Sequence, residues 1–386
     1  MIKNISKILQ AVYLLGFIFA LNIALPTYIS SEFLNLIVGD KLVGIIYAVA
    51  SILTILAFTF MGKALKKYGD YKIALSLVII SLISLLGIYF AKNPLLILFF
   101  FTLITINGTL IAFNLDIFLE RISDEKTTGT IRGNFLSIAS GAWIIAPLLA
   151  GFIVSGENYK DVFLIAGLLL LPVISILISN FSKFKDSTYK HIPFSKLIIA
   201  LPKHKSTYKI LISNFLLGFF FSWMVIYTPI YLHNDMGFNW KEIGLMFTIM
   251  LFPFAILEAP LGRLADERWG EKEMLIAGFI VTAISTALLT FIPNADFWLW
   301  SAGLLTTRIG ASTIEIMNET YFFKKIKEDQ LDVIGLFRMT RPMASVVAPI
   351  LGTVFLIFFD YKYIFLTLGI IMLFGLKYAI TLKDTK

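Results

Sequence analysis

The sequence predicts an all-α membrane protein with twelve transmembrane helices, arranged as two pseudo-symmetric bundles of six. Three observations lead to this prediction: the composition, the succession of hydrophobic runs and a repeat that relates the two halves. Of the 386 residues, 58% are hydrophobic and 15% are charged, and the mean hydropathy is +0.85. A soluble chain of this length could not bury so much apolar surface, whereas each helix in a bilayer needs about 20 apolar residues.

The hydrophobic runs define the twelve expected spans. The first run exceeds the ~7–15-residue core of a cleaved signal peptide, and further spans follow it, so we expect it to be retained. The expected spans are 8–30, 41–64, 72–91, 94–119, 131–154, 160–181, 206–233, 241–262, 273–293, 296–320, 332–357 and 361–382.

Basic residues are concentrated in alternate loops, and this asymmetry predicts the orientation. The poorer set of loops contains only Lys41, Lys92, Lys160, Lys241 and Lys362. Because cytoplasmic loops carry the excess of Lys and Arg, we expect both termini in the cytoplasm. The net charge of +8 then reflects orientation in the lipid bilayer, and we expect no nucleic-acid partner. We expect an integral protein of a bacterial or archaeal cytoplasmic membrane that works as a monomer.

The longest loop, 182–205, divides the chain into an N-terminal bundle at 1–181 and a C-terminal bundle at 206–386. It is rich in lysine and contains an apolar segment between Pro193 and Pro202 that is too short to cross a bilayer. We expect this basic linker either to place an interfacial helix against anionic headgroups or to be a plain connection.

The two halves repeat each other at an offset of 202 residues. Small residues and a proline of the fifth span, Gly133, Ala142, Ala146, Pro147 and Ala150, recur in the eleventh span as Gly335, Ala344, Ala348, Pro349 and Gly352. Small residues let helices approach closely, and proline lets a helix bend. We therefore expect both helices to pack at the interface between the two halves.

Several classes of chemistry find no support in the composition. The chain has no cysteine, which excludes disulfides and thiol catalysis. Its three histidines, at 191, 204 and 233, fall in loops or at a helix end, so we expect no metal site. With no nucleophile–base set in view, we expect neither an enzyme nor a bound cofactor.

Two polar loops occupy equivalent positions in the two halves. Gly262–Lys272 reads GRLADERWGEK, and Gly62–Lys72 reads GKALKKYGDYK. Together with twelve spans in two repeated sixes and a long basic central loop, they resemble the major facilitator superfamily of secondary transporters. The second loop matches the signature of that family at Gly262, Asp266 and Gly270, and we expect these glycines to allow a turn or a close approach.

The resemblance implies alternating access, with a central cavity lined by spans one, four, seven and ten. The pattern from Gly133 to Gly151 is similar to a weakened antiporter motif in which Ala replaces several Gly. Two departures stand out. Lys66 or Leu65 takes the place of the acid in the first loop, and Ile104 takes the place of the arginine that family members often carry four residues before the glycine of span four.

The loops also suggest how the cytoplasmic side closes. Asp266 is expected to meet the start of span five, where Arg132 and the helix dipole both favour an anion. In the other half, Lys66 and Lys67 are expected to face Asp332 at the start of span eleven. The signature loop contributes a further cation, Arg268. The alternative is that these charges only mark the membrane surface.

Ionisable residues within spans cost roughly 2.5–3.5 kcal/mol each on insertion scales, so each needs a partner or a function. Asp116 in span four and Glu315 in span ten are candidates for proton coupling, because burial favours the protonated form of a carboxylate. The alternative is that Glu315 and Glu319 neutralise Arg338 and Arg341 of span eleven. For Glu319 and Arg341 we favour this second interpretation.

Arg308 lies nearest the middle of the membrane. Its guanidinium could bind a carboxylate or a phosphate, or pair with Glu315 about two turns away on the same helix face, and we favour the ion pair. The other candidates for the substrate cavity are polar or aromatic residues of the inner spans: Asn22, Asn107, Asn134, Asn214, Trp223 and Tyr227.

The function we expect is proton-coupled efflux, by antiport, of a small amphiphilic or drug-like solute. It rests on the antiporter-like pattern and on the aromatic interior. The alternatives are proton-coupled uptake of a sugar or organic anion, with Arg308 as its best residue, and transport of a lipid or lysolipid. From a different class, a membrane sensor or scaffold that transports nothing is a further alternative. Fold alone does not decide among them.

Overall fold

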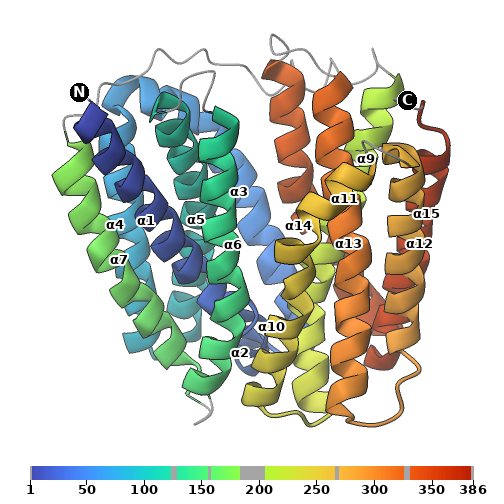
Figure 1. The fold of residues 1–386 in the computed structure, drawn as a ribbon. Helices are drawn as coiled ribbons and strands as arrows, with labels where there is room; N and C mark the ends of the chain where they lie inside the picture. The colour runs from blue at the N-terminus through green and yellow to red at the C-terminus, as the bar shows by residue number, and fades with distance from the viewer. Residues whose placement is uncertain are drawn as a thin grey trace. The chain divides into compact units, whose positions relative to one another are not determined.

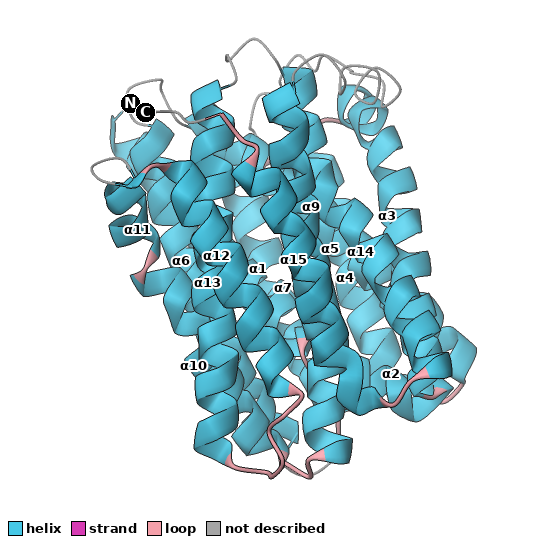
Figure 2. Ribbon diagram, turned by 90° about the vertical axis from the view of Figure 1, so that its right-hand side faces the viewer, coloured by secondary structure: helices cyan, strands magenta, loops and turns pink. Residues whose placement is uncertain are grey.

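The computed structural model describes residues 2–122, 128–154, 158–182, 205–265, 269–325 and 331–383. Within these ranges the chain is built from helices joined by short connections (Figures 1 and 2), which confirms the all-α prediction. The first half contains α1 (Ile2–Thr27), α2 (Ser30–Val38), α3 (Asp40–Tyr68), α4 (Asp70–Phe90), α5 (Pro94–Ile122), α6 (Thr128–Ile153) and α7 (Lys160–Phe181). The second contains α9 (Lys205–Ile230), a π-helical turn (Tyr231–Asp235), α10 (Trp240–Ile256), α11 (Glu258–Leu264), α12 (Glu271–Leu289), α13 (Phe297–Lys325), α14 (Leu331–Phe358), a 3₁₀ turn (Tyr361–Tyr363) and α15 (Ile364–Ile380).

Each of the twelve expected spans coincides with a described helix or with two successive helices. Nine helices among the described residues are long and apolar enough by themselves to cross a membrane. The other three have identifiable reasons for falling short. In α6 the described apolar segment is Ser137–Ile153, because the side chains of several residues before it lie outside the described residues. Helix α10 has only 17 residues and is continued by α11. Helix α13 is long enough but carries charged and polar side chains.

The residues cluster by contact into two compact units. The first unit comprises Met1–Phe33 and Val49–His191, and the second comprises Leu34–Ala48 and Ile192–Lys386. The beginning of α3 therefore groups with the second unit, which a division of the sequence at the central loop does not foresee. The boundaries proposed from the sequence stay a prediction, because most of the linker at 182–205 lies outside the described residues.

In the first unit, α1 packs against α6 and α7, and α4 packs against α5 and α7 (Figure 1). The contact between α1 and α6 depends on Gly16, because a side chain there would overlap the ring of Phe135. At the other contact of α1, the buried Asn22 donates a hydrogen bond from Nδ2 to the carbonyl oxygen of Ala166 in α7, at 2.6 Å.

The second unit repeats this arrangement. Helix α9 packs against α14 and α15, while α12 packs against α13 and α15. Gly218 of α9 lies against Ala344 of α14, where an added Cβ would be 3.1 Å from the alanine Cβ. Gly218 follows Gly16 by the same 202 residues that relate the two halves in sequence. The contact of α1 with α6 and the contact of α9 with α14 therefore each depend on a glycine at the equivalent position.

The polar loops contain an equivalent turn in both halves. Gly69, before α4, has φ 81° and ψ 162°, and Gly270, before α12, has φ 82° and ψ 157°. Only glycine adopts such angles without strain, and a buried acid follows each of them, Asp70 and Glu271. Gly262 lies inside α11, and no described atom lies within 4 Å of a Cβ placed on it, so its expected role stays a prediction.

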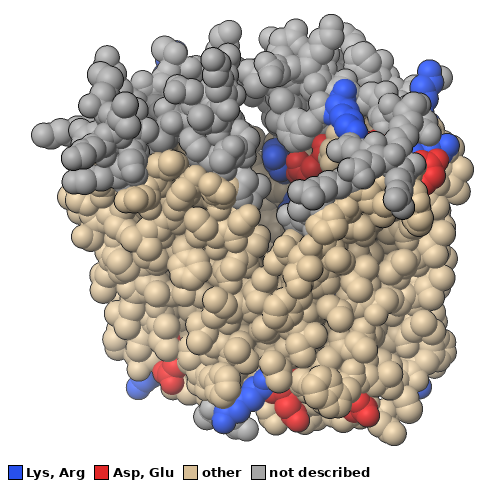
Figure 3. All heavy atoms as spheres, in the orientation of Figure 1, with Lys and Arg blue, Asp and Glu red and all other residues tan. Residues whose placement is uncertain are grey.

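Charge follows the pattern expected of membrane helices. On the face of the second unit in Figure 3, the described charged side chains gather near the ends of the helices, and an uncharged surface lies between them. Helices α13 and α14 are the exception, because they carry charged residues within their membrane spans. These charges require an explanation.

Candidate functional site

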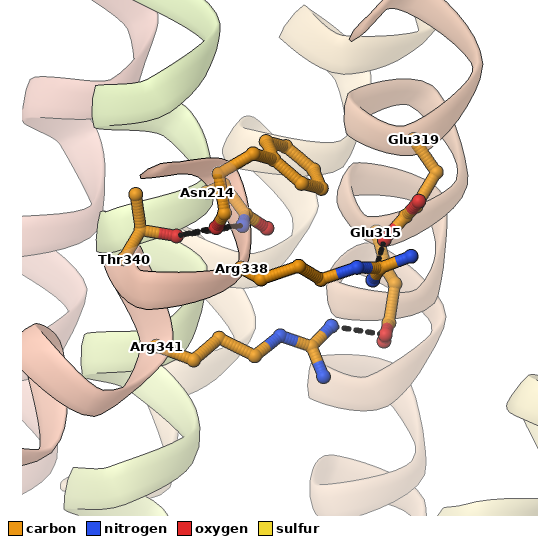
Figure 4. A network of polar contacts seen from close by, with 7 residues as sticks. Asn214, Glu315, Glu319, Arg338, Thr340 and Arg341 are labelled. Carbon is orange, nitrogen blue, oxygen red and sulfur yellow. Dashed lines mark hydrogen bonds and ion pairs between the residues drawn. The ribbon is translucent and has the colours of Figure 1, made fainter. Parts of the chain in front are cut away.

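Two ion pairs connect α13 to α14 in the second unit. Arg338 Nη1 lies 2.8 Å from Glu319 Oε1, and Arg341 pairs with Glu315 (Figure 4). The acids are four residues apart on one face of α13, and the arginines are three apart on one face of α14. The two pairs therefore lie one helical turn apart, and the register of each helix explains why both form.

The pairs remain open to solvent. The side chain of Glu315 is 24% exposed and that of Arg341 is 44% exposed. Charged groups within apolar spans require water or an opposite charge, and here each acid has an arginine as its partner. The alternative in which both acids neutralise the arginines of span eleven is the arrangement found. Arg341 of α14 pairs with Glu315, and the pairing of Glu315 with Arg308 that the sequence favoured stays a prediction.

Arg308 precedes Glu315 by seven residues in α13 and is almost completely buried, at 1% exposure. Its guanidinium carbon lies 5.0 Å from the ring centre of Phe220 and 5.4 Å from that of Phe221, both in α9. The guanidinium of Arg341 lies 5.8 Å from the same Phe221 ring. Aromatic faces stabilise cations that have lost water, so Phe221 supports two of the arginines.

Buried polar contacts hold both helices against α9. Asn214 Nδ2 donates to Thr340 Oγ1 at 2.8 Å and to the Phe337 carbonyl at 3.3 Å, which fixes α14 next to its arginines (Figure 4). Ser213 Oγ donates to Asn318 Oδ1 at 2.6 Å, which fixes α13 next to its acids. Asn214, expected in the cavity lining, is thus a buried support for the site.

Trp223 and Tyr227 are also buried, although the sequence placed them in the cavity lining. The Trp223 ring packs 5.5 Å from Phe219 and 5.4 Å from Tyr227, measured between ring centres. The Tyr227 hydroxyl donates to the Pro349 carbonyl at 2.8 Å. Both side chains therefore stabilise the packing of α9 on α14, and neither is accessible to a solute in this conformation.

In the first unit, Asp116 is exposed on α5, so the burial expected for a coupling carboxylate is not found. Asn107 and Asn114 lie two turns apart on the opposite face of the helix and are buried. Neither the Asn107 amide nitrogen nor the Asn114 side chain has a hydrogen-bond partner among the described residues. Asn22 faces α7, and Asn134 is exposed. A coupling role for Asp116 stays a prediction.

The gating residues are only partly described. Asp266 and Arg268 lie outside the described residues, as do the side chains of Arg132 and Asp332. Lys66 and Lys67 are exposed, and Lys67 Nζ lies 4.9 Å from the ring centre of the adjacent Tyr68. The two contacts proposed to close the cytoplasmic side therefore stay predictions.

Two of the small residues of the eleventh span have a role within their own unit. Ala142, Ala146, Pro147, Ala348 and Pro349 are buried. Ala344 packs against Gly218, and a side chain at Gly352 would overlap the Tyr227 ring, so both residues serve the contact of α14 with α9. The surroundings of Gly133 and Gly335 lie outside the described residues. The expected role of this set between the halves stays a prediction.

Sequence reasoning missed the contribution of Phe220 and Phe221. Phenylalanine occurs 36 times in the chain, so a neighbouring pair carries no signal of its own. The contact of these rings with Arg308 could have been predicted only if the rotation of α9 relative to α13 had been known. Within the described ranges, no group of three or more His, Asp or Glu is placed to hold a metal ion.

Membrane-length helices in two units, with ion pairs inside the spans, define a polytopic membrane protein of the secondary-transporter class. The chain matches the family described as Major Facilitator Superfamily over residues 8–241 and 210–385. It belongs to the major facilitator superfamily, as the sequence motifs predicted, and is a transporter rather than an enzyme.

Solved structures resemble the chain over nearly its whole length. One is a mutant of the nucleoside transporter NupG, with 12% sequence identity, a TM-score of 0.78, and coverage of 97% of this chain and 99% of that chain. At this identity the likeness shows the fold alone. A search of curated proteins finds no match.

Proposed function

We propose that this protein is a proton-coupled secondary transporter of a small solute, in which Glu315 is the carboxylate that binds and releases the proton. The observation that carries the proposal is the ion pair between Glu315 and Arg341, which joins two helices of the second unit while the acid stays accessible to water. Protonation of Glu315 removes its attraction for Arg341. Proton binding and a rearrangement of α13 relative to α14 are thereby coupled.

Glu315 is better suited to this role than the other two acids. Glu319 lies one turn nearer the end of α13, and its partner Arg338 is the more exposed of the two arginines. Asp116 is exposed on α5, whereas the side chain of Glu315 is only 24% exposed. When the Glu315 pair opens, Arg341 still has the face of Phe221 beside it, so an open state is accessible.

The direction of transport depends on whether the proton and the solute bind alternately or at the same time. Occupation in turn gives efflux by antiport, which the pattern in span five favours. Occupation together gives uptake by symport. Both use the same carboxylate, so the proposal for Glu315 is independent of the direction.

The test uses purified protein in proteoliposomes that contain a pH-sensitive dye and are exposed to lipophilic cations, sugars and organic acids. We expect solute-dependent proton movement with one class in wild type. In Glu315→Gln this movement disappears, while exchange of a labelled solute across the membrane continues. The matched control is Glu319→Gln, which removes the neighbouring acid of the same helix and is expected to retain coupling.

Two results would contradict the proposal. Coupling that survives in Glu315→Gln but disappears in Asp116→Asn would identify Asp116 as the proton carrier. Exchange of labelled solute by wild type without any proton movement would identify a uniporter or a transporter coupled to another ion.

A further inference from the structure

We infer that the beginning of α3, Asp40–Ala48, is a latch: it packs against α9 and α14 through Gly44 in this structure and separates from them when the two units change their arrangement during transport. The inference goes beyond the proposed function, because it requires neither the coupling role of Glu315 nor a particular solute. It follows from the lack of space at Gly44, from the support of the surface that receives Gly44, and from the stiffness of α3.

No side chain fits between Gly44 and the helices beside it. A Cβ placed on Gly44 would lie 2.3 Å from Thr353 Oγ1, 2.4 Å from the Pro349 carbonyl oxygen and 2.5 Å from the Tyr227 hydroxyl oxygen. Two of these atoms belong to α14 and one belongs to α9, and all four residues fall in the second unit. The latch therefore closes only if residue 44 is glycine.

The contact at Gly44 is of a kind that opens readily. Glycine offers only its Cα hydrogens to the three oxygen atoms, and Cα–H···O contacts are weaker than conventional hydrogen bonds. The Tyr227 hydroxyl donates to the Pro349 carbonyl at 2.8 Å, so its hydrogen bond is made within the second unit without the latch. When the latch leaves, this hydroxyl keeps its partner, and opening does not create an unpaired donor there.

The surface that receives Gly44 is supported by other parts of the second unit. The Tyr227 ring lies 5.4 Å from the Trp223 ring and 6.3 Å from the Tyr361 ring, measured between ring centres. The Tyr361 hydroxyl also donates to the Tyr227 carbonyl oxygen at 3.3 Å. Gly352 of α14 allows the Tyr227 ring to lie directly against that helix. None of these contacts involves the latch, so we expect the surface to keep its shape when the latch leaves.

The connection before the latch is compact. Gly39 has φ 80°, an angle that favours glycine, and its amide donates to the Asn35 carbonyl at 2.8 Å, at the end of α2. The Leu42 amide then donates to the Gly39 carbonyl at 3.1 Å. The last residues of α2, from Leu34, group with the second unit together with the latch. We therefore expect the end of α2 and the latch to move together.

Helix α3 is too stiff to bend between the latch and the rest of the helix. It is continuous from Asp40 to Tyr68, yet its beginning groups with the second unit and its remainder, from Val49, groups with the first. Residues 45–61 contain neither glycine nor proline, which are the usual sites of sharp kinks. Alternating access moves one bundle against the other. Because α3 does not bend, this movement separates the latch from α9 and α14.

The experiment uses the absence of cysteine from the chain. Thr353→Cys introduces one thiol at a buried residue, 5% exposed, that lies against Gly44. The rate at which this thiol reacts with a maleimide is measured in the purified full-length protein, well below its melting temperature. We expect a slow reaction in Thr353→Cys alone, because the latch opens part of the time. Adding Gly44→Ala or Gly44→Val should raise the rate about 10-fold or more, because the closed state becomes overpacked.

Two controls separate opening of the latch from a loss of folding. Thr286→Cys in α12 introduces a thiol at a residue that is completely buried, and its reaction should not accelerate when Gly44→Val is added. Gly108→Ala in α5 adds the same methyl group where no described atom lies closer than 3.6 Å, and it should leave the reaction of Thr353→Cys unchanged. Alanine also has a higher helix propensity than glycine, so Gly44→Ala does not weaken α3 itself.

A permanent contact at Gly44 predicts a different result. Gly44→Val would then lower the melting temperature, and the thiols of Thr353→Cys and Thr286→Cys would become reactive together. That result overturns the inference, and so does an unchanged rate for Thr353→Cys in the presence of Gly44→Val.

The measurement involves no solute and no proton gradient, so its outcome is distinguishable from that of the coupling experiment. Faster reaction of Thr353→Cys with Gly44→Val, beside proton coupling that survives in Glu315→Gln, would support the latch and reject the proposed function. An unchanged rate, beside coupling that is lost in Glu315→Gln, would reject the latch and support the proposed function.

Discussion

Glu271 of α12 is the buried member of an ion pair whose other member, Lys324 of α13, is partly exposed. The side chain of the acid is 2% exposed and that of the lysine is 44% exposed. Glu271 follows Gly270 directly and begins α12, where the unpaired amide groups of a helix start favour a negative charge. The pair joins two helices of the second unit, and the unequal burial of its members has a measurable consequence.

Removal of the lysine should destabilise the protein more than removal of the acid. Lys324→Gln leaves a carboxylate in a buried place with less compensation, whereas Glu271→Gln leaves a lysine that water can solvate. We expect Lys324→Gln to cost about 1–3 kcal/mol and Glu271→Gln to cost less, with the double variant close to Glu271→Gln. Thermal unfolding of the purified protein measures all three. A greater loss in Glu271→Gln than in Lys324→Gln would contradict this account.

The glycines of the signature loop should respond differently to alanine. Gly270 has a positive φ, so Gly270→Ala should cost about 1 kcal/mol or more of stability, and Gly69→Ala should cost a similar amount in the other half. Gly262 is helical and has space for a Cβ among the described atoms, so Gly262→Ala should be neutral or slightly stabilising. Equal losses in Gly262→Ala and Gly270→Ala would show that Gly262 is needed in another conformation.

The helices could be predicted from the sequence because hydropathy reports directly on the membrane. Every expected span coincides with helix, including that of α13, whose polar side chains weaken the hydrophobic signal. The end of α10 at Ile256 and the separate α11 were not predicted. The signature loop was recognised, but the conformation of Gly262 depends on where α11 ends, and a motif does not specify that position.

The site could be predicted only in part. The spacing of Glu315, Glu319, Arg338 and Arg341 indicated two ion pairs, but which acid meets which arginine depends on the offset between α13 and α14. From the sequence of α13 alone, Arg308 was the expected partner of Glu315, whereas the partner that the structure describes, Arg341, comes from α14. Burial of Trp223 follows from the rotation of α9 about its axis, which hydropathy does not reveal when both faces are apolar.

The contact between α9 and α14 should be sensitive to any side chain at residue 352. Gly352→Ala places a methyl group into the Tyr227 ring and should cost about 1–3 kcal/mol of stability. Tyr227→Leu makes space, so the double variant should be no less stable than Tyr227→Leu alone. The matched control is Gly141→Ala in α6, where no described atom lies within 4 Å of the added Cβ. Melting temperatures of the four variants check the prediction, which fails if losses at 352 and 227 simply add.

Asn22 should act on stability rather than on recognition of the solute. Its side-chain amide is buried and donates to the Ala166 carbonyl, so Asn22→Ala leaves that carbonyl without this hydrogen bond. We expect a loss of about 1–3 kcal/mol in stability, with an unchanged KM for transport once rates are expressed per folded protein. Transport assays beside melting curves separate the two effects. A raised KM at unchanged stability would contradict this prediction and would identify Asn22 as a solute-binding residue. Loss of the hydrogen bond between α1 and α7 would then have no effect on stability, and direct contact with the solute would explain the change in affinity.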